Sequence, residues 1–255
     1  MVKGLENFAE FFKDYNTNYV LIGGAACDIL INDAGLNFRA TKDLDIILIV
    51  EALSKDFISR FWEFIKQGVY EQKQNSTGER KYYRFLKPQH KEFPVQIELF
   101  ARKPDFLTLR SEANLSPIPT DEDLSSLSAI LMNDDYYQFT ITRSINKNEL
   151  QIASTETLIC LKAKAYLDLT ERKLKGEQID SKVINKHKND VIRLATLLYG
   201  DAIISLPTSI KNDMQDFIDE IQKTPIDYKQ IGKSLGIKLD EQSIIEQLKR
   251  FFQLN

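Results

Sequence analysis

The feature that most constrains the fold is an apolar run that ends in two glycines. Residues 20–22 (Val-Leu-Ile) are typical of a short buried strand, and Gly23 and Gly24 end it. Residues 25–31 are mostly helix formers, so the glycines are predicted to form a strand-to-helix turn. Such a turn brings bare backbone N–H groups to a helix N-terminus, where a phosphate can bind.

A second strand is predicted for residues 43–50, and it starts with two aspartates on either side of Leu44. Because side chains alternate along a strand, Asp43 and Asp45 share one face and Leu44 points to the other. Neighbouring carboxylates repel each other and resist burial, and a divalent cation relieves that conflict. An isolated pair of this kind is usually solvated, so the glycine turn upstream is what favours a joint metal and phosphate site.

The motif from Gly23 to Asp45 reads G-G…R-x-T-x-D-x-D, with Arg39 and Thr41 at its third and fourth defined positions. It resembles the signature of the nucleotidyltransferase superfamily that includes DNA polymerase β. It is most similar to the AbiEii-type nucleotidyltransferases, many of which are toxins of bacterial toxin–antitoxin systems. The resemblance implies an α+β fold with a mixed sheet flanked by helices. It also implies that Gly23, Gly24, Arg39 and Thr41 bind a nucleoside triphosphate.

The resemblance further implies a third metal-binding carboxylate on a neighbouring strand. Strands are predicted for residues 81–86 and 95–100, and Glu98 lies on the polar face of the second. Many relatives carry aspartate at this place, so the longer glutamate is a departure. The oxygen ligands of Asp43, Asp45 and Glu98 suit Mg²⁺, with Mn²⁺ as the alternative cation. An exposed strand glutamate is the simpler interpretation of Glu98.

The sequence changes character near residue 150. A catalytic nucleotidyltransferase domain is expected over residues 1–150, with its last strand at 136–143. Residues 151–255 are expected to form a mostly helical domain that completes the nucleotide and substrate cleft. Their first two helices are predicted at 155–173 and 181–199.

Lys162 and Asp190, on these two helices, resemble a later motif of the AbiEii-like family. The resemblance implies that Lys162, as an exposed side chain, contacts the nucleotide phosphates during transfer. Asp190 would orient that lysine or the substrate. Arg193 stands where many relatives have another aspartate. A plain salt bridge between two helices explains Lys162 and Asp190 equally well.

The acceptor of the transferred nucleotide is open. A basic stretch near Glu98 mixes cations with aromatic rings: Arg80, Lys81, Arg84, Lys87, Lys91, Tyr82, Tyr83 and Phe85. This mixture suits a single-stranded nucleic-acid end, although a solvated strand with core aromatics fits it as well. The family resemblance points to RNA, especially a tRNA 3′ end, and to an antitoxin partner. The alternatives are a small-molecule, antibiotic-type transferase and a nucleotide-binding protein without transfer activity.

Composition bears on the binding partners and the cellular location of the protein. The net charge of −3 gives no global attraction to nucleic acid. Two cysteines, Cys27 and Cys160, imply no disulfide framework, and no run of residues suits a signal peptide or a membrane span. A cytoplasmic location is therefore expected. His90 and His187 have no cysteine or histidine partner at ligand spacing, which argues against zinc.

Overall fold

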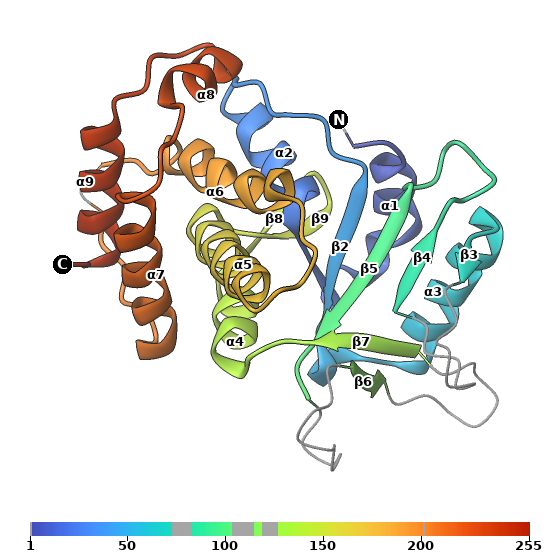
Figure 1. Cartoon of the computed structure of the whole chain (residues 1–255). Coiled ribbons are helices and arrows are strands. Elements are labelled where there is room, and N and C mark those ends of the chain that lie inside the picture. Colours follow the sequence, from blue (N-terminus) through green and yellow to red (C-terminus); the bar gives the residue numbers. More distant parts are fainter. Residues whose placement is uncertain (1, 73–82, 104–114, 119–126, 201) are drawn as a thin grey trace. The chain divides into compact units, whose positions relative to one another are not determined.

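The computed structural model of the chain (Figure 1) describes residues 2–72, 83–103, 115–118, 127–200 and 202–255. The chain divides into two compact units. The first unit contains Met1–Ala26 and Ala40–Ala153, and the second contains Cys27–Arg39 and Ser154–Asn255. The second unit therefore includes a short early segment that the sequence did not single out.

The first unit is built on one mixed sheet. Its strands within the described residues are β1 (Tyr19–Ile22), β2 (Asp43–Leu48), β3 (Glu71–Gln72), β4 (Arg84–Leu86), β5 (Gln96–Ala101), β6 (Leu115–Ile118), β7 (Leu127–Leu131), β8 (Ser144–Lys147) and β9 (Leu150–Ala153). The main order is β3-β4-β5-β2-β1-β9-β8. In addition, β7 pairs with β5, and β6 pairs with β7.

Strands β1, β2 and β5 form the centre of this sheet and position the candidate site. Strand β2 runs antiparallel to β1 and parallel to β5, and Figure 1 shows β2 and β5 side by side. All of β1 is buried, as its apolar run predicts. In β2, Leu44 is buried and the flanking Asp43 and Asp45 are half-buried, which confirms the predicted alternation.

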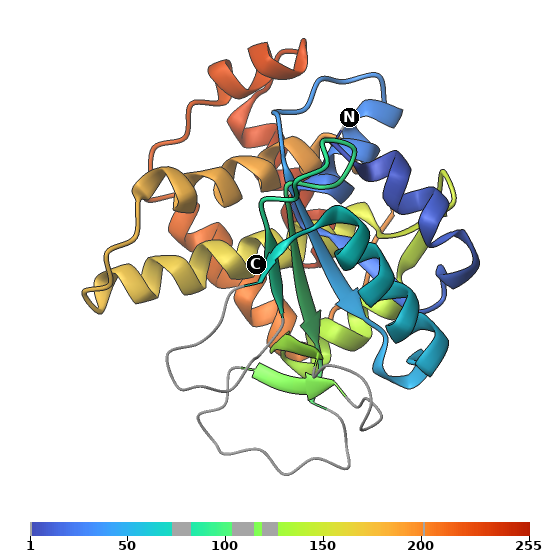
Figure 2. The same ribbon diagram turned by 90° about the vertical axis from the view of Figure 1, so that its right-hand side faces the viewer.

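Two helices of the first unit, α1 (Leu5–Phe11) and α3 (Lys55–Gly68), cover one face of the sheet (Figure 2). A short 3₁₀ turn, Lys13–Tyr15, follows α1, and another, Val50–Ala52, follows β2. Helix α3 begins after Ser54, whose hydroxyl caps it by accepting a hydrogen bond from the Phe57 N–H at 3.2 Å. Its aromatic stripe is core: Phe57, Phe61 and Trp62 are all buried.

The strand predicted for residues 136–143 is wrong, because Asp134–Thr142 form helix α4. Aromatic and β-branched residues suggested a strand here. Local capping favours the helix instead: the Asn133 side chain accepts from the Asp135 N–H at 2.9 Å. Tyr136, Phe139 and Thr140 then share a buried side at helical spacing.

The second unit is helical within its described residues. Helix α2 (Gly23–Asp33) starts in the first unit, and its residues from Cys27 onward belong to the second. The other helices are α5 (Thr155–Leu174), α6 (Ser181–Ala195), α7 (Thr208–Ile221), α8 (Tyr228–Leu235) and α9 (Glu241–Phe252). Helices α5 and α6 match the predicted elements, although α6 ends four residues before the expected residue 199.

The predicted fold class is confirmed. A mixed sheet with flanking helices is followed by a mostly helical C-terminal half, which is an α+β arrangement. Within the described part of the chain, no helix combines the length and apolar character that crossing a membrane requires.

Candidate functional site

The two glycines of the motif are packed against two other motif residues in the first unit. Gly23 has a φ of +68°, and a Cβ added to it would overlap Oδ2 of Asp45. A Cβ on Gly24 would overlap the hydroxyl of Thr41. The turn at the N-terminus of α2 therefore needs glycine because the Asp45 and Thr41 side chains occupy the space beside its backbone.

Gly23→Ala is expected to destabilise the protein more than Gly35→Ala. Gly35 also has a positive φ, +74°, but a Cβ there would meet nothing within 4 Å. The Gly35 change therefore costs only left-handed strain, about 1–2 kcal/mol. The Gly23 change adds the overlap with Asp45, roughly a further 1–3 kcal/mol. Urea unfolding of both variants measures the difference, and equal losses would show that Asp45 does not pack against this turn.

The predicted carboxylates lie on adjacent strands in register. Asp45 of β2 pairs with Glu98 of β5, and Asp43 pairs with Gln96, in a parallel ladder. Residues paired in this way project to the same side of a sheet. Asp43, Asp45 and Glu98 are half-buried, whereas their neighbours Leu44 and Ile97 are buried on the opposite side. Their oxygens are the ligand type that Mg²⁺ prefers.

Glu98 forms an ion pair that is not apparent from the sequence. Arg84 of β4 is in register with Glu98, and its Nε forms an ion pair with Oε1 of Glu98. Among the described residues, no group of three or more His, Cys, Asp or Glu side chains is arranged to hold a metal ion. Asp43 and Asp45 thus provide two nearby carboxylates. For Glu98 to act as a third ligand, its ion pair with Arg84 would have to break.

In the second unit, Asp190 lies at the centre of a basic cluster. The Asp190 side chain is fully buried. Arg39 donates two hydrogen bonds to it, from Nε to Oδ1 at 3.0 Å and from Nη2 to Oδ2 at 2.6 Å. Lys162 Nζ lies 3.4 Å from Oδ2, and Arg193 Nη1 lies 3.3 Å from Oδ1. We call these four residues the Asp190 cluster.

The cluster corrects the expected exposure of Lys162 and shows its contact with Asp190. Lys162 was expected to be exposed, but it is only 6% exposed, because its helix turns it toward Asp190. Burial alone would raise the pKa of Asp190, but the hydrogen bonds of Arg39 and the charges of Lys162, Arg39 and Arg193 hold it below its usual value. Asp190 is therefore ionised, and the Lys162–Asp190 contact fits both the orienting role and the plain salt bridge.

His187 lies close to the same charges. Burial, followed by the positive charge of Lys162, lowers its pKa from 6.5 to about 4, and the charges of Lys186 and Arg39 act in the same direction. Asp190 opposes the shift without reversing it. At neutral pH His187 is therefore neutral.

Acidification is expected to destabilise the protein through His187. Below pH 6.5 His187 is protonated in the unfolded chain, whereas in the folded protein it stays neutral down to about pH 4. The free energy of unfolding therefore decreases as the pH falls from 6.5 to 4, and the contribution of His187 to stability is complete above pH 6.5. The loss between pH 7 and pH 5 is about 2 kcal/mol, at roughly 1.4 kcal/mol per pKa unit. Urea unfolding at both pH values should show a smaller loss in His187→Gln, and an unchanged loss would refute the assignment.

The basic stretch is only partly available for nucleic acid. Arg80, Lys81 and Tyr82 lie outside the described residues. Phe85 is fully buried and packs edge-on against Phe61, so it is a core ring and cannot stack on a base. Lys87 is exposed and pairs with Glu71 at 3.0 Å.

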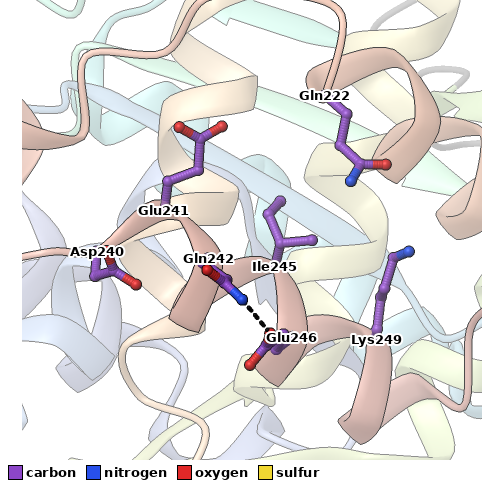
Figure 3. Close-up of a pocket in the computed structure, with 7 residues that line it drawn as sticks. All are labelled: Gln222, Asp240, Glu241, Gln242, Ile245, Glu246 and Lys249. Atoms are coloured by element: carbon purple, nitrogen blue, oxygen red, sulfur yellow. Dashed lines mark hydrogen bonds between the residues drawn. The ribbon is translucent and has the colours of Figure 1, made fainter.

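A hollow of about 570 Å³ in the second unit contains none of the predicted site residues (Figure 3). It is lined by Gln222, Asp240, Glu241, Gln242, Ile245, Glu246 and Lys249. Asp240 is engaged in capping α9, because it accepts from the Ser243 N–H at 2.9 Å. The carboxamide of Gln242 donates to Glu246 at 2.9 Å. The hollow therefore carries no argument for a second candidate site.

Comparison with known proteins assigns no family. No protein-family model matches the chain, and no curated protein matches it. Among solved structures, the crystal structure of JHP933 from Helicobacter pylori is similar over 96% of this chain and 85% of that chain, with 15% sequence identity and a TM-score of 0.41. A similarity of this degree gives no residue a role, so the candidate site depends on its own geometry.

Proposed function

We propose that the protein transfers a nucleoside monophosphate from a nucleoside triphosphate to an acceptor hydroxyl, with Mg²⁺ or Mn²⁺ as the cation. One observation carries the proposal: the glycine turn at the start of α2 packs directly on Asp45, which is in register with Glu98. A phosphate-binding turn and a pair of cation-binding carboxylates thus adjoin each other within one unit.

Each residue of the first unit has a part in this scheme. The Gly23 and Gly24 amides hold triphosphate oxygens at the helix N-terminus. Thr41 fixes the turn through its contact with Gly24, and Asp43 and Asp45 hold the cation. A bound divalent cation would lower the pKa of the acceptor hydroxyl and stabilise the leaving pyrophosphate.

The remaining assignments concern the second unit and Glu98. Lys162 supplies positive charge to the phosphates, and Asp190 orients it, with Arg39 as a further nucleotide-binding residue. Glu98 completes the ligand set once it leaves Arg84. The proposed acceptor is an RNA end in the cytoplasm, with an antitoxin as regulatory partner, and this part depends on the family resemblance alone.

One observation favours a second candidate, a nucleotide-binding protein without transfer activity. The Arg84–Glu98 ion pair keeps the third carboxylate occupied. Thermal unfolding with each nucleoside triphosphate, with and without Mg²⁺, tests for binding, and incubation with an α-labelled triphosphate tests for transfer. Stabilisation that needs Mg²⁺, together with transfer, supports the enzyme. Stabilisation without transfer to RNA or to a cationic small molecule would support the binder.

A further inference from the structure

The Asp190 cluster holds more positive charge than its carboxylate can neutralise. Arg39, Lys162 and Arg193 all lie within 3.4 Å of an Asp190 oxygen. Within these four residues, three cations thus share a single carboxylate. The four side chains range from 0% to 21% exposed, so water screens these charges poorly.

The Asp190 carboxylate also has little capacity left to accept hydrogen bonds. An ionised carboxylate offers about four acceptor positions. Arg39 takes two of them, and Lys162 and Arg193 approach one each. Further N–H donors in the cluster must therefore find another acceptor.

Arg193 carries such donors. Its guanidinium has about five N–H groups, and a bond from Nη1 to Asp190 is among its contacts. Its Nε is buried and has no partner within the described part of the chain. A buried donor without an acceptor is rare and costly in native proteins. Burial is the largest cause of the lowered pKa of His187, and the positive charges of Lys162, Lys186 and Arg39 lower it further.

We propose that Arg193 and Lys162 together bind one doubly charged phosphate group beside Asp190. The oxygens of such an anion would give acceptors to both side chains, including the buried Nε of Arg193. Asp190 then positions the two cations and contacts no ligand itself. Many members of the family that the chain resembles carry an aspartate where Arg193 stands, so this contact is a feature of the present chain.

The identity of the ligand rests on the proposed function. In nucleotidyl transfer the available phosphate groups are the terminal phosphates of the triphosphate and the pyrophosphate released from it. Pyrophosphate bound to Arg193 and Lys162 would then act as a product inhibitor. Inorganic pyrophosphate alone tests binding to the site formed by Arg193 and Lys162. No cation, nucleotide or acceptor is added, so the result does not depend on whether transfer occurs.

The experiment follows both histidine side chains by NMR between pH 4 and pH 7, with pyrophosphate and with sodium chloride at equal ionic strength. Pyrophosphate should move the pKa of His187 from about 4 toward its ordinary value of 6.5. The exposed His90, in the first unit, is the internal control and should not respond. No response of His187, or an equal response of both histidines, would overturn the proposal.

Variants test whether Arg193 binds the pyrophosphate. Arg193→Gln should weaken pyrophosphate binding, measured by calorimetry at pH 7, roughly 10- to 100-fold, the loss of one charge-assisted hydrogen bond. Arg193→Lys keeps the charge and should bind with intermediate affinity, which separates binding from folding. Arg172→Gln makes the same change in an exposed ion pair with Glu177 and should bind like the wild type. Equal affinity of Arg193→Gln and Arg172→Gln would contradict the assignment, even if transfer activity had been shown.

Discussion

Asp190→Ala should lower the free energy of unfolding by roughly 3–5 kcal/mol, the cost of leaving buried charges without their partner. The carboxylate is fully buried and is the common contact of Arg39, Lys162 and Arg193. Its removal leaves three cations close together in a poorly hydrated place. Urea unfolding at pH 7 measures the loss.

Asp216→Ala is the matched control for this change. Asp216 is exposed on α7, so its removal should change stability by less than about 0.5 kcal/mol. The stability loss of Lys162→Met should lie between those of Asp190→Ala and Asp216→Ala, because Asp190 still forms its ion pairs with Arg39 and Arg193. A loss under about 1 kcal/mol in Asp190→Ala would mean that the cluster is not assembled around this carboxylate.

Asp45→Asn should lower nucleotidyl transfer by roughly 10³-fold or more while the protein stays folded. A neutral amide is a poor Mg²⁺ ligand, and cation stabilisation of the transferring phosphate is worth several kcal/mol, at about 1.4 kcal/mol per factor of ten. Asn and Asp have nearly the same shape, so the contact with the Gly23 turn is preserved. The rate of label transfer from an α-labelled triphosphate measures the effect.

Asp56→Asn provides the comparison for Asp45→Asn. It removes the same charge from an exposed position in the first turn of α3, in the same unit. Its transfer rate should match that of the wild type. If Asp45→Asn retained near-normal turnover in Mg²⁺, the cation-binding role of β2 would be wrong.

Local patterns predicted much of the first unit. The apolar run of β1 and the alternation in β2 are each determined by residues close in sequence. Helix α4 was missed because its composition favours a strand, while the Asn133 cap and the packing of one side favour a helix. The sequence left Phe85 open between a base-stacking ring and a core ring, because aromatic residues look alike in sequence whether they are buried or exposed.

The Asp190 cluster was only partly predictable. The resemblance connected Lys162 with Asp190, but Arg39 contacts Asp190 across a separation of 151 residues, which no local pattern encodes. Arg39 was assigned to the nucleotide because of its place in the motif, and the structure shows the carboxylate that it also contacts. The Arg84–Glu98 pair was missed for a similar reason, because it depends on the register of β4 against β5.

The most direct test of the central claim is covalent labelling of RNA. The full chain is incubated with total RNA, Mg²⁺ and each of the four α-labelled nucleoside triphosphates in turn, and the RNA is separated on a denaturing gel. The account predicts label on RNA with at least one nucleotide, lost on chelation of Mg²⁺ and lost in the double variant Asp43→Asn/Asp45→Asn. Absence of label from RNA and from every other acceptor with the folded wild-type chain, or equal labelling by the double variant, would contradict it.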